Sequence, residues 1–137
     1  MAISTKTSVA THILAYIAYH ADSELTSEQI AASIQTNPVV VRRMMGKLKK
    51  AGLLDRKKLV KSPNDISLLA IFQAVEDEYH IFTVHSSGHP LCPVGGAIGG
   101  ILSDRFGKIE QKAFVELQQY TLQDVLEQIQ RHHAEPI

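Results

Sequence analysis

Apolar residues recur every three or four positions over most of the chain, which is the spacing of amphipathic helices. We expect helices over residues 3–20, 27–34, 38–51, 68–75, 93–118 and 122–129. The exception is the stretch 53–61, where two apolar pairs flank a charged tip. The hydrophobic pattern therefore predicts a mainly α protein with one small β element.

The predicted helix over 38–51 has clear start and stop signals. Asn37 can cap its first free N–H groups, and Pro38 suits the first helical position because its missing donor would be unpaired there. Gly52 follows the last turn, where a left-handed residue is usual. One side of the helix is apolar and consists of Val41, Met44, Met45 and Leu48. The other faces are mostly cationic and carry Val39, Arg42, Arg43, Lys47 and Lys50. This profile is typical of a recognition helix in the major groove of DNA, although a solvated amphipathic helix shares it.

A shorter helix directly precedes this one. Thr26 and Gln29 have the spacing of a capping box, which marks its first turn. Residues 35–37 leave room only for a tight turn, and the small Ala31 and Ala32 allow the two helices to approach closely. A short helix, a tight turn and a longer cationic helix form the helix-turn-helix arrangement.

After Gly52 the periodicity changes. Leu53-Leu54 and Leu59-Val60 flank the charged residues 55–58, which fits a minimal β-hairpin. In a winged helix such a hairpin lies along a phosphate backbone. Its tip lacks the Asn-Gly or Gly-Gly that tight hairpins prefer. The expected fold is therefore a winged helix-turn-helix DNA-binding domain with a short β-hairpin wing.

Charge is strongly segregated, although the 137-residue chain has a formal net charge of zero. Residues 37–61 contain nine basic residues and one acidic residue, which gives this segment +8 and the remainder of the chain −8. A cationic surface on an otherwise acidic body is what a polyanion-binding protein presents. The charge pattern favours DNA binding. The alternative is a basic RNA-binding or protein-interaction module that uses the same helix without operator specificity.

Length and composition fit one domain with a core and an extended appendage. We expect a winged helix-turn-helix domain over 1–75, a linker loop over 76–92 and dimerisation helices over 93–137. No apolar run is long enough to cross a bilayer and no secretory leader is evident. We therefore expect a soluble, cytoplasmic protein without membrane contact.

The long helix predicted over 93–118 spans about 37 Å, more than a domain of this size needs for its own core. Its apolar stripe predicts a homodimer interface formed by Val94, Ile98, Ile101, Leu102, Ile109 and Phe114. Cys92 precedes Pro93, a favoured first helical residue, so we place its sulfur at the helix N-terminus, where free N–H groups lower a thiol pKa. Cys92 is therefore a candidate sensor of oxidation or electrophiles. The alternative is a buried, inert cysteine.

Other chemistry finds little support in the residues. His85, His89 and Cys92 could place three donors around a metal, but no fourth ligand is evident, so we expect no metal site. The glycine-rich run 95–100 lacks the Lys-Ser/Thr of a phosphate loop. No nucleophile–base pair or carboxylate pair stands out, so we expect no enzyme.

Taken in order, these features resemble the Rrf-two family of bacterial winged-helix transcriptional regulators, which includes IscR, NsrR and CymR, and within it the YwnA-like branch. The resemblance covers the chain to about residue 126 and rests on Ile3–Lys6, Asn37–Arg43, Leu48–Leu53, Asp65–Leu69 and Cys92–Gly95. It implies a homodimer, paired through the long helix, that binds a palindromic operator in double-stranded DNA. We expect repression, and the effector, whether a small molecule or a redox signal, stays open.

The resemblance also implies roles for individual residues. The candidate DNA-binding residues are Lys6, Asn37, Val39, Val40, Arg42, Arg43, Lys47, Arg56, Lys57 and Lys58. The two valines and the two arginines match the family's base-reading surface, whereas Lys6 and the wing residues match its backbone contacts. Two departures matter: the wing is short and lacks the family's Gly-rich tip, and a single cysteine stands in place of the three closely spaced cysteines of the cluster-binding members. We therefore expect no iron–sulfur cluster and no other cofactor.

Overall fold

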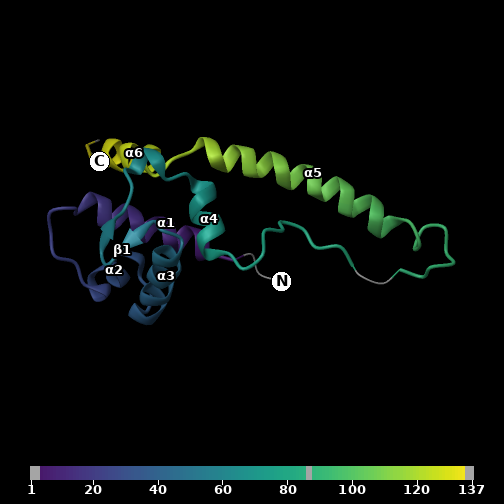
Figure 1. Ribbon diagram of the computed structural model, residues 1–137, viewed down its shortest axis with the longest axis horizontal. Helices are drawn as coiled ribbons and strands as arrows, with labels where there is room; N and C mark the ends of the chain where they lie inside the picture. Colours follow the sequence, from purple (N-terminus) through teal and green to yellow (C-terminus); the bar gives the residue numbers. More distant parts are fainter. Residues whose placement is uncertain (1–3, 86–87, 135–137) are drawn as a thin grey trace.

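The computed structural model describes residues 4–85 and 88–134. Its elements are, in chain order, α1 (Lys6–Tyr19), α2 (Ser27–Ile34), α3 (Pro38–Lys50), β1 (Leu54–Asp55), β2 (Lys58–Leu59), the 3₁₀ turn η1 (Pro63–Asp65), α4 (Leu68–Val75), α5 (Ile98–Gln119) and α6 (Leu122–Ala134). Helices α1 to α4, the hairpin and α6 gather into one body, from which α5 and the segment before it extend together (Figure 1). We call residues 4–75 and 120–134 the head and residues 76–85 and 88–119 the arm. The fold is mainly α with a two-stranded antiparallel hairpin, as expected.

The head has one hydrophobic core, to which α1 to α4, the hairpin and α6 contribute. Its fully buried side chains include Ile13, Leu14, Ile30, Val41, Met44, Leu48, Leu54, Ile66, Ile71 and Leu122. Leu122 begins α6, and burying such a side chain contributes about 1.5–3 kcal/mol. Two backbone hydrogen bonds add to this contact: the Leu68 N–H donates to the Tyr120 carbonyl at 2.9 Å, and the Leu122 N–H donates to the Ile66 carbonyl at 2.8 Å. α6 therefore packs on the head, so the expected unit over 93–137 divides between arm and head.

Local signals define the helix-turn-helix formed by α2 and α3. Thr26 Oγ1 accepts from the Gln29 N–H at 3.1 Å and Gln29 Oε1 accepts from the Thr26 N–H at 2.9 Å, which completes the predicted capping box. Asn37 Oδ1 accepts from the Val39 N–H at 2.8 Å at the start of α3. Gly52 follows α3 with a left-handed φ of 79°. The start and stop signals predicted for this motif are confirmed.

β1 and β2 form the predicted wing. The strands pair antiparallel with Leu54 opposite Leu59, and Arg56 and Lys57 make the tip. Arg56 has a φ of 56°, the left-handed conformation that glycine normally supplies in such turns. The tight hairpin thus forms without glycine, with an arginine in a conformation that costs roughly 1–2 kcal/mol.

The long helix starts later than expected. α5 begins at Ile98, whereas the sequence pattern predicted a start at Pro93. The preceding residues form turns, in which the Gly96 N–H donates to the Cys92 carbonyl at 2.8 Å. A Cβ on Gly95 or Gly96 would lie 2.9 Å or 2.8 Å from neighbouring backbone, so the chain approaches itself more closely here than side chains allow. Glycine also disfavours a helix. Cys92 is consequently not at the N-terminus of α5, and that prediction is wrong.

The segment before α5 lies along one face of this helix. Glu110, in the middle of α5, is only 6% exposed and accepts from the Ile81 N–H at 2.5 Å. This donor holds the pKa of the Glu110 carboxyl below its usual value. The rings of Phe82 and Phe106 lie against each other with centroids 4.9 Å apart. One face of α5 is therefore covered by its own chain. Within residues 4–85 and 88–134, no helix combines the length and apolarity needed to cross a membrane.

Candidate DNA-binding surface

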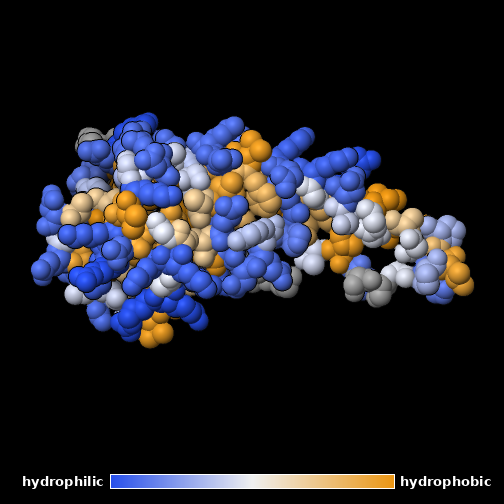
Figure 2. Space-filling model, viewed as in Figure 1, coloured by the Kyte–Doolittle hydropathy of each residue, from blue (hydrophilic) through white to orange (hydrophobic). Residues whose placement is uncertain are grey.

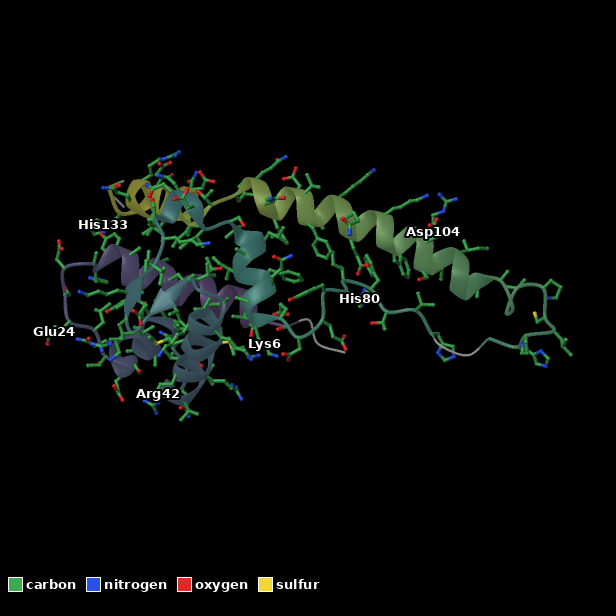
Figure 3. All side chains as sticks on the ribbon, in the orientation of Figure 1. Lys6, Glu24, Arg42, His80, Asp104 and His133 are labelled. Carbon is green, nitrogen blue, oxygen red and sulfur yellow. The ribbon has the colours of Figure 1, made fainter. Side chains whose placement is uncertain are left out.

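The outward side of α3 carries basic side chains along its length. Its exposed residues are Val39, Arg42, Arg43, Gly46, Lys49 and Lys50. The opposite side inserts into the core, where Val41, Met44 and Leu48 are at most 2% exposed. Figure 3 shows Arg42 at the edge of the head, directed away from it. A row of hydrogen-bond donors with an apolar contact near the helix start is suited to reading base edges in the major groove.

Two residues expected at this surface have other roles as well. Val40 is half-buried and packs against the core, so it lies at the edge of the outward side rather than on it. The Asn37 oxygen caps α3, which leaves its amide nitrogen for a partner. Lys49 and Lys50 lie on the outward side, and neither was among the candidate DNA-binding residues, although the sequence pattern already placed Lys50 on a cationic face of this helix. Their helical spacing from the two arginines, two turns earlier, could have identified them.

Arg42 lies on the flank of α3 that faces the wing. Its Nη1 lies 3.4 Å from Glu28 Oε1 of α2, and both side chains are more than half exposed. An exposed pair of this kind contributes at most about 1 kcal/mol, so a phosphate or a base can replace Glu28. Arg42 also lines an open groove between α2, α3 and the wing, together with Ser23, Glu24, Leu25, Ser27, Met45 and residues 55–60. The structure thus brings Arg42 and the wing cations to one groove.

Lys6 and Lys47 lie on the opposite flank of α3 and share one acidic partner. Lys6 Nζ is 2.6 Å from Asp77 Oδ2, and Lys47 Nζ is 3.3 Å from Asp77 Oδ1. Lys47 also donates to the Val75 carbonyl at 3.3 Å. The hydrogen bond from Lys6, followed by the one from Lys47, lowers the pKa of Asp77. Sequence reasoning missed Asp77, because 71 and 30 residues separate it from its partners and no local pattern marks such contacts.

The first turn of α1 lies beside this lysine pair, where head and arm meet (Figure 3). Thr5 precedes α1 without a side-chain cap, and Ser4 Oγ accepts from the Lys6 N–H at 3.1 Å. Ser4 in turn donates to Glu76 Oε1 at 2.7 Å. A helix N-terminus with a neighbouring lysine favours an anion such as a phosphate.

Cys92 lies in the turns before α5 and is exposed. Its Sγ accepts from the Gly95 N–H at 3.4 Å. The N–H groups of Gly95 and Val94 lower the pKa of the thiol. Leu91 and Val94 are 87% and 66% exposed, so neither covers the sulfur. In this chain the cysteine is therefore not buried, and a turn rather than a helix end supplies the N–H groups.

The residues around Cys92 do not fit an iron–sulfur cluster, which proteins hold mainly with several cysteine thiolates. The chain contains one cysteine. In the part of the chain that the structure describes, no three His, Cys, Asp or Glu side chains come together as a metal site.

α5 presents an apolar stripe away from the face that its own chain covers. Its exposed members, with the neighbouring turn residue included, are Val94, Ile98, Ile101 and Ile109. Figure 2 shows hydrophobic residues, in orange, on the surface of the arm. Two predicted interface residues differ, because Leu102 is half-buried and Phe114 packs on Phe72 of α4 with ring centroids 5.7 Å apart. Val115, nearer the head, is also exposed on α5 but was not among the predicted residues. The exposed stripe therefore differs from the predicted one at Leu102 and Phe114.

Known proteins match this chain over most of its length. The model of the Rrf2, or Rrf-two, family, described as iron-dependent transcriptional regulators, matches residues 3–128. YwnA of Bacillus subtilis strain 168, named as an HTH-type transcriptional regulator, is 41% identical over 130 residues, which cover 90% of this chain and 96% of YwnA. A crystal structure described as that of a DNA-binding protein is 37% identical with a TM-score of 0.71, over 88% of this chain and 98% of its own. IscR of T. potens has a TM-score of 0.72 over 100% of this chain and 94% of its own, and at 17% identity this similarity concerns the fold alone.

These matches agree with the fold of head and arm. The helix-turn-helix of α2 and α3, the two-stranded wing and the long α5 all lie within the matched range. The resemblance drawn from the residues is therefore confirmed, and this chain belongs to the Rrf2 family of DNA-binding transcriptional regulators.

Proposed function

We propose that the chain acts as a homodimer that binds a palindromic operator in double-stranded DNA and represses transcription. The observation that carries this proposal is the outward side of α3, which is exposed, cationic and flanked by further cations. The wing lies on one flank, next to Arg42, and Lys6 and Lys47 lie on the other. A surface of this layout has a centre that reads bases and edges that hold phosphates.

The first nine residues of α3, from 38 to 46, supply the base contacts. With 13 residues, α3 is about 20 Å long, and the major groove admits a helix of this kind. Arg42 and Arg43 can each donate two hydrogen bonds to O6 and N7 of a guanine, and Val39 suits a thymine methyl group. Lys49 and Lys50 follow two turns later, where a straight helix leaves the curved groove and meets the backbone.

The two flanks hold phosphates on either side of the groove. Lys6 acts together with the first turn of α1, which Thr5 does not cap, and residues 56–58 act from the wing. Phosphates then take the places of Asp77 and Glu28. This exchange is favourable because both acids are exposed and their ion pairs are weak.

The exposed stripe of α5 supports a homodimer. In a two-fold dimer the same patch meets itself, and the two α3 helices can then lie about 34 Å apart on one face of the DNA. Replacing Ile101 and Ile109 together with Asp should yield monomers that lose operator binding, because the charges would be buried in the interface. Sedimentation velocity checks this, and a monomeric wild-type protein at micromolar concentration would contradict the dimer.

A dimer bound to a promoter excludes RNA polymerase, which is why we propose repression.

We also propose that covalent modification of Cys92 changes operator affinity. The support is an exposed thiol of lowered pKa that precedes Ile98, the first residue of the exposed stripe on α5. A bulky or charged group there would alter how the two copies meet.

Operator binding is tested by selection from a random-sequence DNA library with the full-length protein. The selected duplexes should share an inverted repeat and should bind about 10³-fold or more tightly than a shuffled duplex at the same salt concentration. Equal affinity for both duplexes, or a preference for single-stranded RNA, would contradict operator binding and support the basic interaction module instead.

A further inference from the structure

Gly46 is a helical glycine for which residues 4–85 and 88–134 show no internal contact that would exclude a side chain. It lies in the middle of α3, where glycine destabilises a helix relative to alanine. Gly52, Gly95 and Gly96 have visible reasons, because Gly52 has a φ of 79° and a Cβ on Gly95 or Gly96 would meet neighbouring backbone at less than 3.0 Å. Gly100 and Gly107 share the open space of Gly46, but they lie in α5 on the arm. A Cβ built on Gly46 meets no atom within 4 Å. The space beside Gly46 is open, so a Cβ there would meet only a molecule that approaches α3 from outside.

The position of Gly46 on the helix indicates what lies there. It is exposed and belongs to the outward side of α3, two turns after Val39 and one turn after Arg42 and Arg43. Lys50 continues the same row one turn later. Gly46 therefore has no side chain at a position between the residues that the proposed function directs into the major groove, Val39, Arg42 and Arg43, and Lys50, which it places on the DNA backbone.

We propose that Gly46 is the point at which the backbone of α3 lies directly against a base edge of the operator. This inference rests on the proposed function and deepens it, because it makes Gly46 a specificity-determining residue. The methyl group of an alanine at this position would place a carbon about 1.5 Å beyond Cα and move the helix away from the base edge by a similar distance. Arg42 and Arg43 would then lose their bidentate hydrogen bonds to guanine, because these bonds require close approach of the helix to the bases.

Gly46→Ala separates this role from a structural one. The substitution should raise the melting temperature by a few degrees, because alanine favours the helix and meets open space. It should weaken binding of the duplex that the wild-type protein selects by on the order of tenfold, the size of one lost base contact. Binding of a shuffled duplex should stay near the wild-type value, because backbone-only binding does not need full insertion.

Gly107→Ala is the matched control. Gly107 lies in α5 and also has no atom within 4 Å of a built Cβ, but it is on the arm rather than on the head. It should share the gain in melting temperature and keep the affinity for both duplexes. The full-length wild type and both variants are titrated by fluorescence anisotropy at one salt concentration, and their melting is followed by circular dichroism.

Four results of these titrations would overturn the inference, and the last of them would also overturn the proposed function. An unchanged preference for the selected duplex in Gly46→Ala overturns the inference, and so does an equal loss on both duplexes, which would indicate a phosphate contact instead of a base edge. If Gly107→Ala weakens binding of the selected duplex as much as Gly46→Ala does, the inference is also overturned, because a change in helix rigidity would then be the cause. A wild-type protein without any preference overturns the proposed function itself, and the inference with it.

Discussion

Replacing Arg56 with glycine should make the protein more stable and its DNA complex weaker. Arg56 holds a φ of 56° at the wing tip, a conformation that costs an L residue roughly 1–2 kcal/mol and that glycine adopts freely. The larger backbone entropy of glycine in the unfolded chain offsets about 0.5–1 kcal/mol of this gain. The free energy of unfolding should therefore rise by about 0.5–1 kcal/mol.

The same substitution removes one cation from each wing. Each phosphate contact contributes about 0.9 to the slope of log affinity against log salt, so a dimer should lose about 1.8 from that slope. Arg56→Ala is the matched control, because it removes the charge but keeps a Cβ that disfavours the left-handed conformation. This variant should bind DNA as weakly as the glycine variant without becoming more stable.

Urea denaturation measures the free energy of unfolding, and fluorescence anisotropy at several salt concentrations measures the slope. Equal stability of the glycine and alanine variants would refute a left-handed wing tip. An unchanged salt slope in both variants would refute contact between the wing and phosphates.

Other consequences can be checked separately. Asp77→Asn should tighten binding to every duplex alike in anisotropy titrations, because Lys6 and Lys47 lose the acid that competes with phosphates; a gain restricted to the selected duplex would count against this. Leu122→Ala should lower the free energy of unfolding by about 2–5 kcal/mol in urea, since α6 belongs to the head core, and a loss below about 1 kcal/mol would mean that α6 is not docked. Alkylation of Cys92 by iodoacetamide should follow pH with a midpoint below the usual thiol pKa, because turn N–H groups stabilise the reactive thiolate. It should change operator affinity in the wild type and not in Cys92→Ser, and an alkylated wild type of unchanged affinity would rule out a sensor.

The elements with local signals could be predicted from the sequence. Thr26, Gln29, Asn37 and Gly52 each lie within a few residues of the helix end that they define, so neighbouring residues suffice to locate α2 and α3. The wing was predicted from the change of period alone. Its left-handed Arg56 was not, because no turn preference of arginine indicates that conformation.

What the sequence could not show depends on contacts between distant residues or on exact backbone paths. The start of α5 was placed too early because the helical spacing of apolar residues continues across Gly95 and Gly96, where the backbone turns back on itself. Asp77 binds two lysines far away along the chain, and Leu122 completes a core built mainly from the first 75 residues. The candidate base-reading residues were easier to find, since one amphipathic helix carries them, and only Val40 lies on the partly buried side.

The central claim is that the outward side of α3 reads base sequence, and one titration tests it most directly. Wild type, Arg43→Ala and Lys57→Ala are titrated with the selected duplex and with a shuffled duplex at one salt concentration. Arg43→Ala should cost about 1–3 kcal/mol on the selected duplex and little on the shuffled one, whereas Lys57→Ala should weaken both alike. An unchanged ratio of the two affinities in Arg43→Ala would contradict the claim.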